Sequence, residues 1–398
     1  MDHARRNVFL LACCQALLFT NNVTLISLNG LAGFALADTK ALATLPVTGY
    51  VVGAALSTFP ASLWMKRVGR RNGFLTGTLF GLAGGAITTA AIWQSNFWLL
   101  VFGTLVLGTY NAFGQYYRFA AADATPVHWK ARAISLVMAG GLVGGIVGPE
   151  MSKVTRDLVQ PTFLASYASL MGFCLLTMAI LAGLRIPDPH AAEAHGPTRP
   201  LREIMAQPVF VVAVAVAALG YGVMNLLMTS TPLAMGFCGH PYAAAASVIS
   251  AHVIAMFGPS FFTGSLIHRF GVLNVMMAGV ALMFGCVAIG LSGQLVTHFW
   301  WSLVLLGVGW NFMYVGGTTL LTEAYRPAEK AKAQGANEIL VFCTTATSSF
   351  ASGVLVNASG WNTLNYVALP FLAIAGSAAL WLALRRRAVV RGHLRGAG

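Results

Sequence analysis

The feature that most constrains this chain is a series of long segments without a single Asp, Glu, Lys or Arg. None of these four residues occurs in 72–117 or in 270–322, for example. A helix that crosses a membrane needs about 20 mainly apolar residues, so the shorter segments have room for one span and the longer ones for two. We therefore expect twelve spans, over residues 8–36, 41–65, 73–93, 97–120, 132–154, 162–184, 207–231, 243–267, 273–293, 298–321, 336–357 and 361–384.

The overall composition agrees with a protein whose main solvent is lipid. Hydrophobic residues make up 57% of the 398 positions, and charged residues only 9%, whereas soluble domains average about 25% charged residues. The net charge of +13 raises the possibility of nucleic-acid binding, but the positions of the charges exclude it. Twenty of the 24 Lys and Arg residues fall on one side of the expected spans, the exceptions being Lys40, Arg118, Lys153 and Arg156. This asymmetry predicts a cytoplasmic-membrane protein with both termini in the cytoplasm, in contact with anionic lipid.

A linker rich in proline divides the spans into two groups of six. We expect an N-terminal half at 1–184, a cytoplasmic linker at 185–206, and a C-terminal half at 207–398 that ends in a basic tail.

The two halves repeat each other in sequence. The segment ADATPVHWKARA, residues 122–133, is echoed by TEAYRPAEKAKA, residues 322–333, and Tyr110–Asn111 is echoed by Trp310–Asn311 at the same spacing. Two parallel repeats around a central path are a known transporter architecture. The fold class expected is therefore all-α, with twelve spans in two pseudo-symmetric halves.

In the loop between spans two and three, Arg67, Gly69, Arg70 and Arg71 form a pattern that resembles a signature of the Major Facilitator Superfamily. Ser62 and Lys66 replace the glycine and the aspartate of that signature. The second half carries a weaker copy of the pattern in Gly264, Arg269 and Gly271. The resemblance covers nearly the whole chain and implies a transporter that works by alternating access, as a monomer.

Spans one, four, seven and ten line the central cavity in that superfamily, so the resemblance implies that their polar and aromatic residues bind substrate. Amides facing lipid would have no partners, which leaves cavity lining or helix–helix hydrogen bonds as the two alternatives. The candidates are Asn21, Asn22, Tyr110, Asn111, Gln115, Arg118, Tyr221, Asn225, Trp310, Asn311 and Tyr314. Amides beside aromatic rings suit a neutral or weakly charged, partly planar solute.

Four ionisable residues within or near the spans leave alternatives open. Arg118 could bind an anionic group or pair with Asp123 one helical turn away. Glu150 and His252 are candidates for proton coupling, the alternatives being a charge at the outer rim and a helix–helix hydrogen bond. Glu338 begins span eleven near Lys332, and we interpret it as a local partner.

The repeated charged segments suggest a gate at the cytoplasmic ends of the spans. We expect Asp123 and Glu323 to pair with the loops that contain Arg67 and Arg269 when the cytoplasmic side closes. The alternative is a solvated face, because surface ion pairs contribute only about 0–1 kcal/mol.

Three classes of function remain to be weighed. An embedded enzyme would need convergent acids, a His–carboxylate pair or a metal set, and no span offers one, so we expect no enzyme activity, no cofactor and no metal. A channel or receptor would not explain the duplication. A transporter of a small organic molecule does, with membrane lipid and protons as further partners.

The segments NNVTLISLNGLAG, QYYRFAAAD and TEAYRPAEKAKAQG resemble a bacterial branch of the superfamily associated with riboflavin uptake. The alternative function is proton-coupled efflux of drugs or metabolites, which the Gly144, Gly148 and Pro149 pattern of span five suggests.

Overall fold

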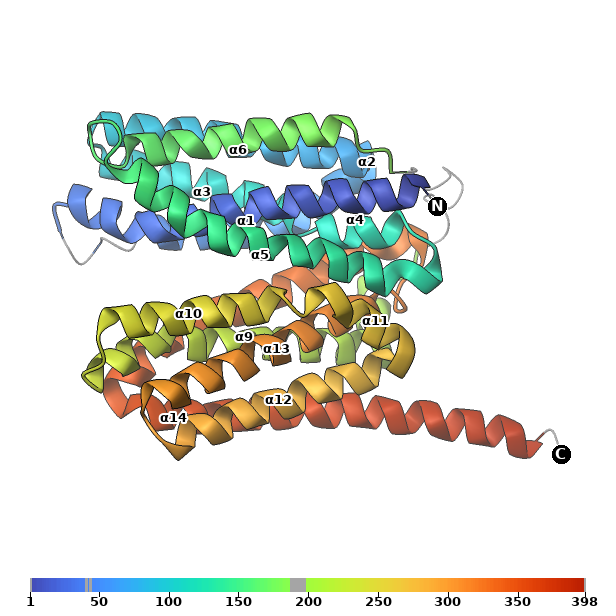
Figure 1. Ribbon diagram of the computed structural model, residues 1–398. Helices are drawn as coiled ribbons and strands as arrows, with labels where there is room; N and C mark the ends of the chain where they lie inside the picture. Colours follow the sequence, from blue (N-terminus) through green and yellow to red (C-terminus); the bar gives the residue numbers. More distant parts are fainter. Residues whose placement is uncertain (1, 40–41, 43–44, 187–197, 397–398) are drawn as a thin grey trace. The chain divides into compact units, whose positions relative to one another are not determined.

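The computed structural model describes residues 2–39, 42, 45–186 and 198–396, and within these residues every regular element is a helix (Figure 1). Residues 187–197 of the expected linker lie outside this description, as does Lys40. The helices before the linker are α1 (Asp2–Leu36), α2 (Leu45–Trp93), α3 (Phe97–Gly114), α4 (Tyr117–Asp123), η2 (Val127–Trp129), α5 (Lys130–Arg156) and α6 (Leu164–Ala182). Those after it are α8 (Leu201–Met205), α9 (Pro208–Phe237), α10 (Tyr242–Phe257), α11 (Ser260–Phe270), α12 (Val272–Ser292), α13 (Val296–Leu321), η3 (Pro327–Glu329) and α14 (Lys330–Gly396).

The chain forms two compact units, and their boundary does not simply follow the linker. The first unit consists of Met1–Pro197 together with Pro327–Ile339, and the second of Thr198–Arg326 together with Leu340–Gly398. The beginning of α14 therefore packs with the first unit, although the rest of that helix belongs to the second.

Glycines in the left-handed region of the backbone interrupt the longest helical stretches. Gly69 has a φ of 81° inside α2, and Gly271 has a φ of 84° between α11 and α12. These two glycines are equivalent in the sequence repeat, and each lies between two expected spans. Gly360, with a φ of 75°, interrupts α14 in the same way. A side chain is disfavoured in this conformation, so glycine allows the chain to turn sharply here.

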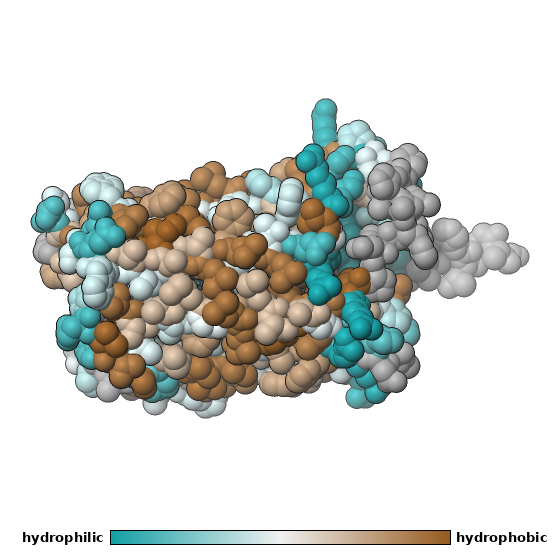
Figure 2. All heavy atoms as spheres, turned by 90° about the horizontal axis from the view of Figure 1, so that it is seen from above, coloured by the Kyte–Doolittle hydropathy of each residue, from teal (hydrophilic) through white to brown (hydrophobic). Residues whose placement is uncertain are grey.

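Nine helices in the described part of the chain are long and apolar enough to cross a membrane, or ten if the bent α10–α11 pair is one span. This number is below the expected twelve for two reasons. The 49 residues of α2 count once, although about 20 suffice for a span, and only Ala358–Ala388 of α14 qualifies. On the face drawn in Figure 2, hydrophobic side chains cover a broad middle band and hydrophilic ones gather toward its ends, as expected for a protein surrounded by lipid.

Close packing of α2 against α3 depends on glycine. A Cβ atom added to Gly108 would lie 2.2 Å from the carbonyl oxygen of Tyr50, and one added to Gly53 would lie 2.0 Å from that of Leu105. Both obstacles are backbone atoms, which cannot move aside as a flexible side chain can. Small residues at such contacts let two membrane helices approach closely, and this approach brings the polar face of α3 near α1 and α2.

Basic side chains close the C-terminal end of α6. Arg6 donates a hydrogen bond to the carbonyl oxygen of Gly183 at 2.6 Å, and Arg71 donates to those of Leu181 and Ala182 at 3.2 and 3.0 Å. The last carbonyl groups of a helix have no partners within it and carry partial negative charge. Two of the basic residues on which the expected orientation rests thus also cap a helix.

We predict that Gly108→Ala lowers the stability of the protein. The added methyl group would force α2 and α3 apart, and overpacking of this kind typically costs about 1–3 kcal/mol. Thermal unfolding in detergent measures the effect. Gly172→Ala in α6 is the matched control, because a Cβ atom at Gly172 meets nothing within 4 Å. Equal melting temperatures for the two variants would contradict the interpretation of this contact.

Candidate functional site

A chain of hydrogen-bonded side chains in the first unit joins α1, α2 and α3. The hydroxyl of Tyr50 donates to Oδ1 of Asn22 at 2.5 Å, and Nδ2 of Asn22 donates to Oδ1 of Asn111 at 2.9 Å. Nε2 of Gln115 donates to the same Asn111 oxygen at 3.0 Å. Asn22 and Gln115 are half-buried, and Asn111 is 6% exposed. Three of the candidate binding residues therefore share one network.

The network continues to a buried ion pair. Nη1 of Arg118 donates to the backbone oxygen of Gln115 at 3.0 Å and to its Oε1 at 3.3 Å. Nη2 of Arg118 pairs with Oε1 of Glu338 at the beginning of α14, and both side chains are at most 2% exposed. Nδ2 of Asn337 donates to the same Glu338 oxygen at 2.7 Å. Our interpretation of Glu338 as a local partner of Lys332 is therefore wrong, and Arg118 pairs with Glu338 rather than with Asp123.

A second ionic cluster surrounds Asp123 at the end of α4. Its Oδ2 accepts hydrogen bonds from Arg70 at 3.0 Å and from Lys330 at 3.1 Å. Arg70 also donates to Oε1 of Gln334 at 2.5 Å, and Ser62 donates to the carbonyl oxygen of Ala331 at 2.7 Å. The loop between spans two and three thus holds the beginning of α14 through side-chain contacts.

The other gate candidates have looser surroundings. Arg67 is exposed, on the same loop as Arg70. Glu323 pairs with Arg386 at 2.6 Å, with both side chains at least 40% exposed. The guanidinium group of Arg269 is exposed and lies 5.2 Å from the ring centroid of Phe270.

Aromatic rings gather in the second unit. Trp310 and Tyr314 of α13 stack with ring centroids 5.0 Å apart, and Tyr221 of α9 contacts both rings edge-on at 5.4 and 5.3 Å. Phe257 of α10 also contacts Trp310 edge-on, with ring centroids 5.8 Å apart. Tyr221 is half-buried, whereas Trp310 is 1% exposed, so the cluster presents Tyr221 at its accessible edge.

A cavity of about 440 Å³ lies in the second unit between α9 and α14. Thr344, Thr347 and Ser348 contribute polar atoms to an otherwise mainly apolar lining. Asn225 donates to the Ser348 hydroxyl at 3.1 Å and to the carbonyl oxygen of Thr345 at 3.3 Å. The volume of this cavity lies in the range of about 300–1,000 Å³ that is typical of small-molecule sites.

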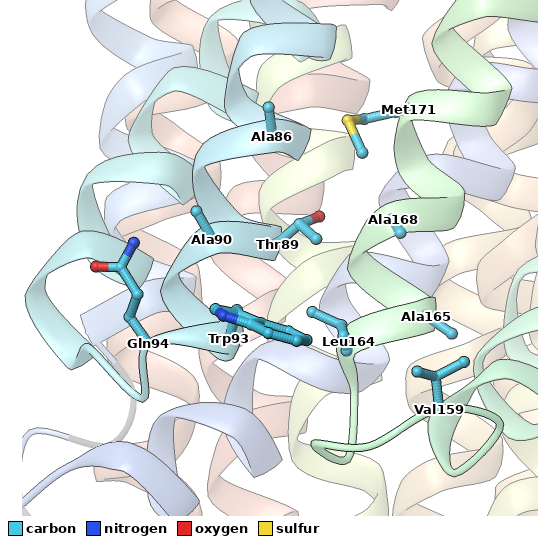
Figure 3. A pocket seen from close by; sticks show the side chains of 10 residues that line it. All are labelled: Ala86, Thr89, Ala90, Trp93, Gln94, Val159, Leu164, Ala165, Ala168 and Met171. Atoms are coloured by element: carbon cyan, nitrogen blue, oxygen red, sulfur yellow. The ribbon is translucent and has the colours of Figure 1, made fainter.

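A larger groove in the first unit is a poorer candidate. It measures about 630 Å³ and lies between α2 and α6, with Trp93 and Leu164 near its end (Figure 3). Its lining includes only Thr89 and Gln94 as polar residues and none with a charge. Its features suit the hydrocarbon chains of lipid better than a polar solute.

Two further candidates hold helices together. Asn311 is fully buried. Its Nδ2 donates to the Met256 carbonyl oxygen at 2.6 Å and to the Ser260 hydroxyl at 2.5 Å. Its Oδ1 accepts a hydrogen bond from the Thr263 hydroxyl at 2.7 Å. Asn21 donates to the carbonyl oxygen of Leu170 at 3.2 Å. Each of these two amides therefore forms hydrogen bonds to neighbouring helices of its own unit.

The remaining candidates belong neither to the hydrogen-bond network of Asn22, Asn111 and Gln115 nor to the ionic cluster around Asp123. Tyr110 is 2% exposed, in the core of the first unit. Glu150 pairs with Lys153 three residues on, at 2.6 Å, and both side chains are more than 60% exposed. His252 is fully buried, and its Nδ1 lies 2.8 Å from the carbonyl oxygen of Leu303.

The sequence analysis missed Gln334 and Asn337 and misread Glu338. A signal for them was present, because three polar residues spaced at i, i+3 and i+4 lie on one face of a helix. That face of α14 meets Arg70 and Arg118.

Comparison with known proteins identifies the family. The sequence model of the Major Facilitator Superfamily matches residues 8–312 and 239–397. The chain is 44% identical to the riboflavin transporter RfnT of Brucella anthropi over 376 residues, 93% of this chain and 94% of that protein. It is 28% identical to the uncharacterized MFS-type transporter YdeG of Bacillus subtilis, over 91% of this chain and 88% of that one.

Solved structures share the fold. The fucose transporter FucP in its outward conformation aligns with a TM-score of 0.75 at 15% identity, over 94% of this chain and 98% of that one. The human organic anion transporter MFSD10 aligns with a TM-score of 0.76 at 12% identity, over 94% and 99%. The family match, the all-helical architecture and the apolar spans together establish that this chain is a multi-pass membrane transporter of the Major Facilitator Superfamily.

Proposed function

We propose that the chain carries riboflavin across the cytoplasmic membrane by alternating access, in the direction of uptake. The observation that carries this proposal is the 44% identity to a riboflavin transporter over nearly the full length of both chains. The same relative leaves the efflux alternative not favoured, and Glu150, the span-five candidate for proton coupling, is exposed and paired with Lys153.

We also propose the complete architecture of twelve spans, six in each half, with both termini in the cytoplasm. The breaks at Gly69 and Gly360 support two spans in each of α2 and α14. The concentration of Lys and Arg on one side supports the orientation. The proposed working unit is a monomer.

Each unit by itself offers chemistry that suits a flavin. In the second unit, the Tyr221–Trp310–Tyr314 cluster supplies aromatic rings, on which a planar aromatic ring system stacks favourably. In the first unit, the amides of Asn22, Asn111 and Gln115 supply hydrogen-bonding groups of the kind that the polar edge of a flavin can use.

The charged cluster around Asp123 is the proposed gate. Arg70 and Lys330 hold Asp123 between the loop after span two and the beginning of α14. We infer that these contacts form and break during the transport cycle, and that Arg67, Arg269 and Glu323 are further charged residues of the gate. Their partial burial makes them stronger than exposed pairs, so the Asp123 cluster carries more of the gate than the Glu323–Arg386 pair.

We predict that the purified chain in proteoliposomes takes up labelled riboflavin and exchanges it with unlabelled riboflavin. Tyr221→Leu should weaken the apparent affinity for riboflavin about tenfold. Stacking of a planar nucleic-acid base on an aromatic side chain is worth about 1–3 kcal/mol, and we expect a similar value for the flavin ring. Tyr366→Leu is the control, because Tyr366 is 59% exposed. Failure of the unaltered chain to bind or exchange riboflavin would refute the proposed function.

We predict that Asp123→Asn slows transport but leaves riboflavin binding nearly unchanged. The substitution removes a hydrogen-bonded charge worth about 1.5–3 kcal/mol from the proposed gate and leaves the amide network intact. Exchange rates and equilibrium binding, measured on the same preparation, separate the two effects. Glu323→Gln should slow transport less. A transport rate equal to that of the unaltered chain would contradict the gate.

A further inference from the structure

The hydrogen bonds around Asn111 fix the direction in which its amide points. Two N–H donors, from Asn22 at 2.9 Å and from Gln115 at 3.0 Å, converge on its Oδ1. Turning the amide over would place its own N–H groups against these two donors. The oxygen is therefore the inward atom, and the NH₂ group is the part that remains for another partner.

Among the described residues, none accepts a hydrogen bond from Nδ2 of Asn111. The side chain is not completely sealed, since 6% of the residue is exposed and its neighbours Asn22 and Gln115 are half-buried. An amide NH₂ group can donate two hydrogen bonds. The open chemistry of this network is thus a pair of donors, which matches an acceptor such as a carbonyl oxygen or a ring nitrogen.

The neighbouring positive charge is already neutralised. The guanidinium group of Arg118 contacts the Glu338 carboxylate and both oxygens of Gln115, and the ion pair is buried. Removing an anion from water is costly unless a cation or several hydrogen bonds compensate it. With its charge balanced by Glu338, Arg118 provides no net charge for an anionic ligand.

From these two observations, and resting on the proposed function, we infer that the network selects uncharged carbonyl-bearing heterocycles and rejects their phosphate esters. Asn111 donates to a carbonyl oxygen or ring nitrogen of the ligand, and Glu338 is the residue that sets the selectivity, because its carboxylate balances the charge of Arg118. Riboflavin fits this chemistry, because its ring system is uncharged and carries two carbonyl groups. Riboflavin 5′-phosphate has the same rings and adds an anionic group.

Competition in proteoliposomes tests this selectivity. Uptake of labelled riboflavin is measured against increasing unlabelled riboflavin or riboflavin 5′-phosphate, and the ratio of the two inhibitory concentrations is the readout. For the unaltered chain, we expect the inhibitory concentration of the ester to be about tenfold higher than that of riboflavin, or more. A charged phosphate that loses its hydrogen bonds to water without replacement costs about 1.5–3 kcal/mol, which corresponds to a factor of this size.

Glu338→Gln should reduce this ratio about tenfold, because the charge of Arg118 is then uncompensated and can attract the phosphate. The double variant Arg118→Gln with Glu338→Gln is the matched control and should restore the original ratio. The double variant still contains Arg70 and Lys330. If its ratio stayed as low as that of Glu338→Gln, the stronger binding of the ester would come from those two residues and not from Arg118. An unchanged ratio in Glu338→Gln, with riboflavin uptake retained, would overturn the inference.

Asn111→Asp tests the donor independently of the ion pair. The carboxylate keeps an oxygen to accept from Asn22 and Gln115 but replaces the NH₂ group with a second acceptor. Riboflavin affinity should fall about tenfold or more, whereas Asn274→Asp on the exposed surface of α12 should leave it unchanged. Unaltered affinity in Asn111→Asp would refute the role of this donor, even if Glu338→Gln failed to fold.

The outcomes also separate this inference from the proposed function. If the unaltered chain binds no riboflavin, the proposed function fails and the inference fails with it. If riboflavin is transported but the ester competes equally well, only the selectivity is refuted. Gel filtration and melting temperatures of each variant establish that the compared proteins are folded.

Discussion

The need to pair every polar group inside a hydrocarbon solvent governs this structure. Helices satisfy the backbone within each span, and side-chain hydroxyls return to the chain that carries them, as Thr58 does to the carbonyl of Ala54 and Thr78 to that of Phe74. Many side chains that cannot be satisfied within one helix are matched across helices, as Asn311 is by Met256 and Ser260. The ion pair of Arg118 and Glu338 is the extreme case, because either charge alone in that position would carry a large desolvation penalty.

Much of the fold was predictable because lipid leaves a simple signature in sequence. The absence of charge outlined the spans, and the repeat placed breaks near Gly69 and Gly271, where the backbone has positive φ. The transporter family followed from the loop around Arg67 and Arg70. Residues 327–339 were not predictable in this way, because a helix that begins in one compact unit and continues in another has no distinct composition at the change.

The site was harder to predict than the fold, and the two repeated asparagines show why. Asn111 and Asn311 occupy equivalent positions, and sequence alone gave them the same role. Ser260 and Thr263 surround Asn311 with partners, whereas two amides converge on one atom of Asn111 and its NH₂ group has no acceptor in the described part of the chain. A repeat fixes where a residue lies along a helix. The neighbours, which come from other helices and have diverged between the halves, determine whether it binds a ligand or another helix.

The neutrality of the Arg118–Glu338 pair also has an electrical consequence. A membrane voltage does work on a charge that crosses it, about 2.3 kcal/mol per elementary charge per 100 mV. A lone arginine in this position would make any movement of its helix depend on that voltage. Paired with Glu338, it moves together with an equal and opposite charge. The membrane voltage therefore does almost no net work on rearrangements that keep the pair together. The rate of such a step would then be the same in an energised cell as in a depolarised one.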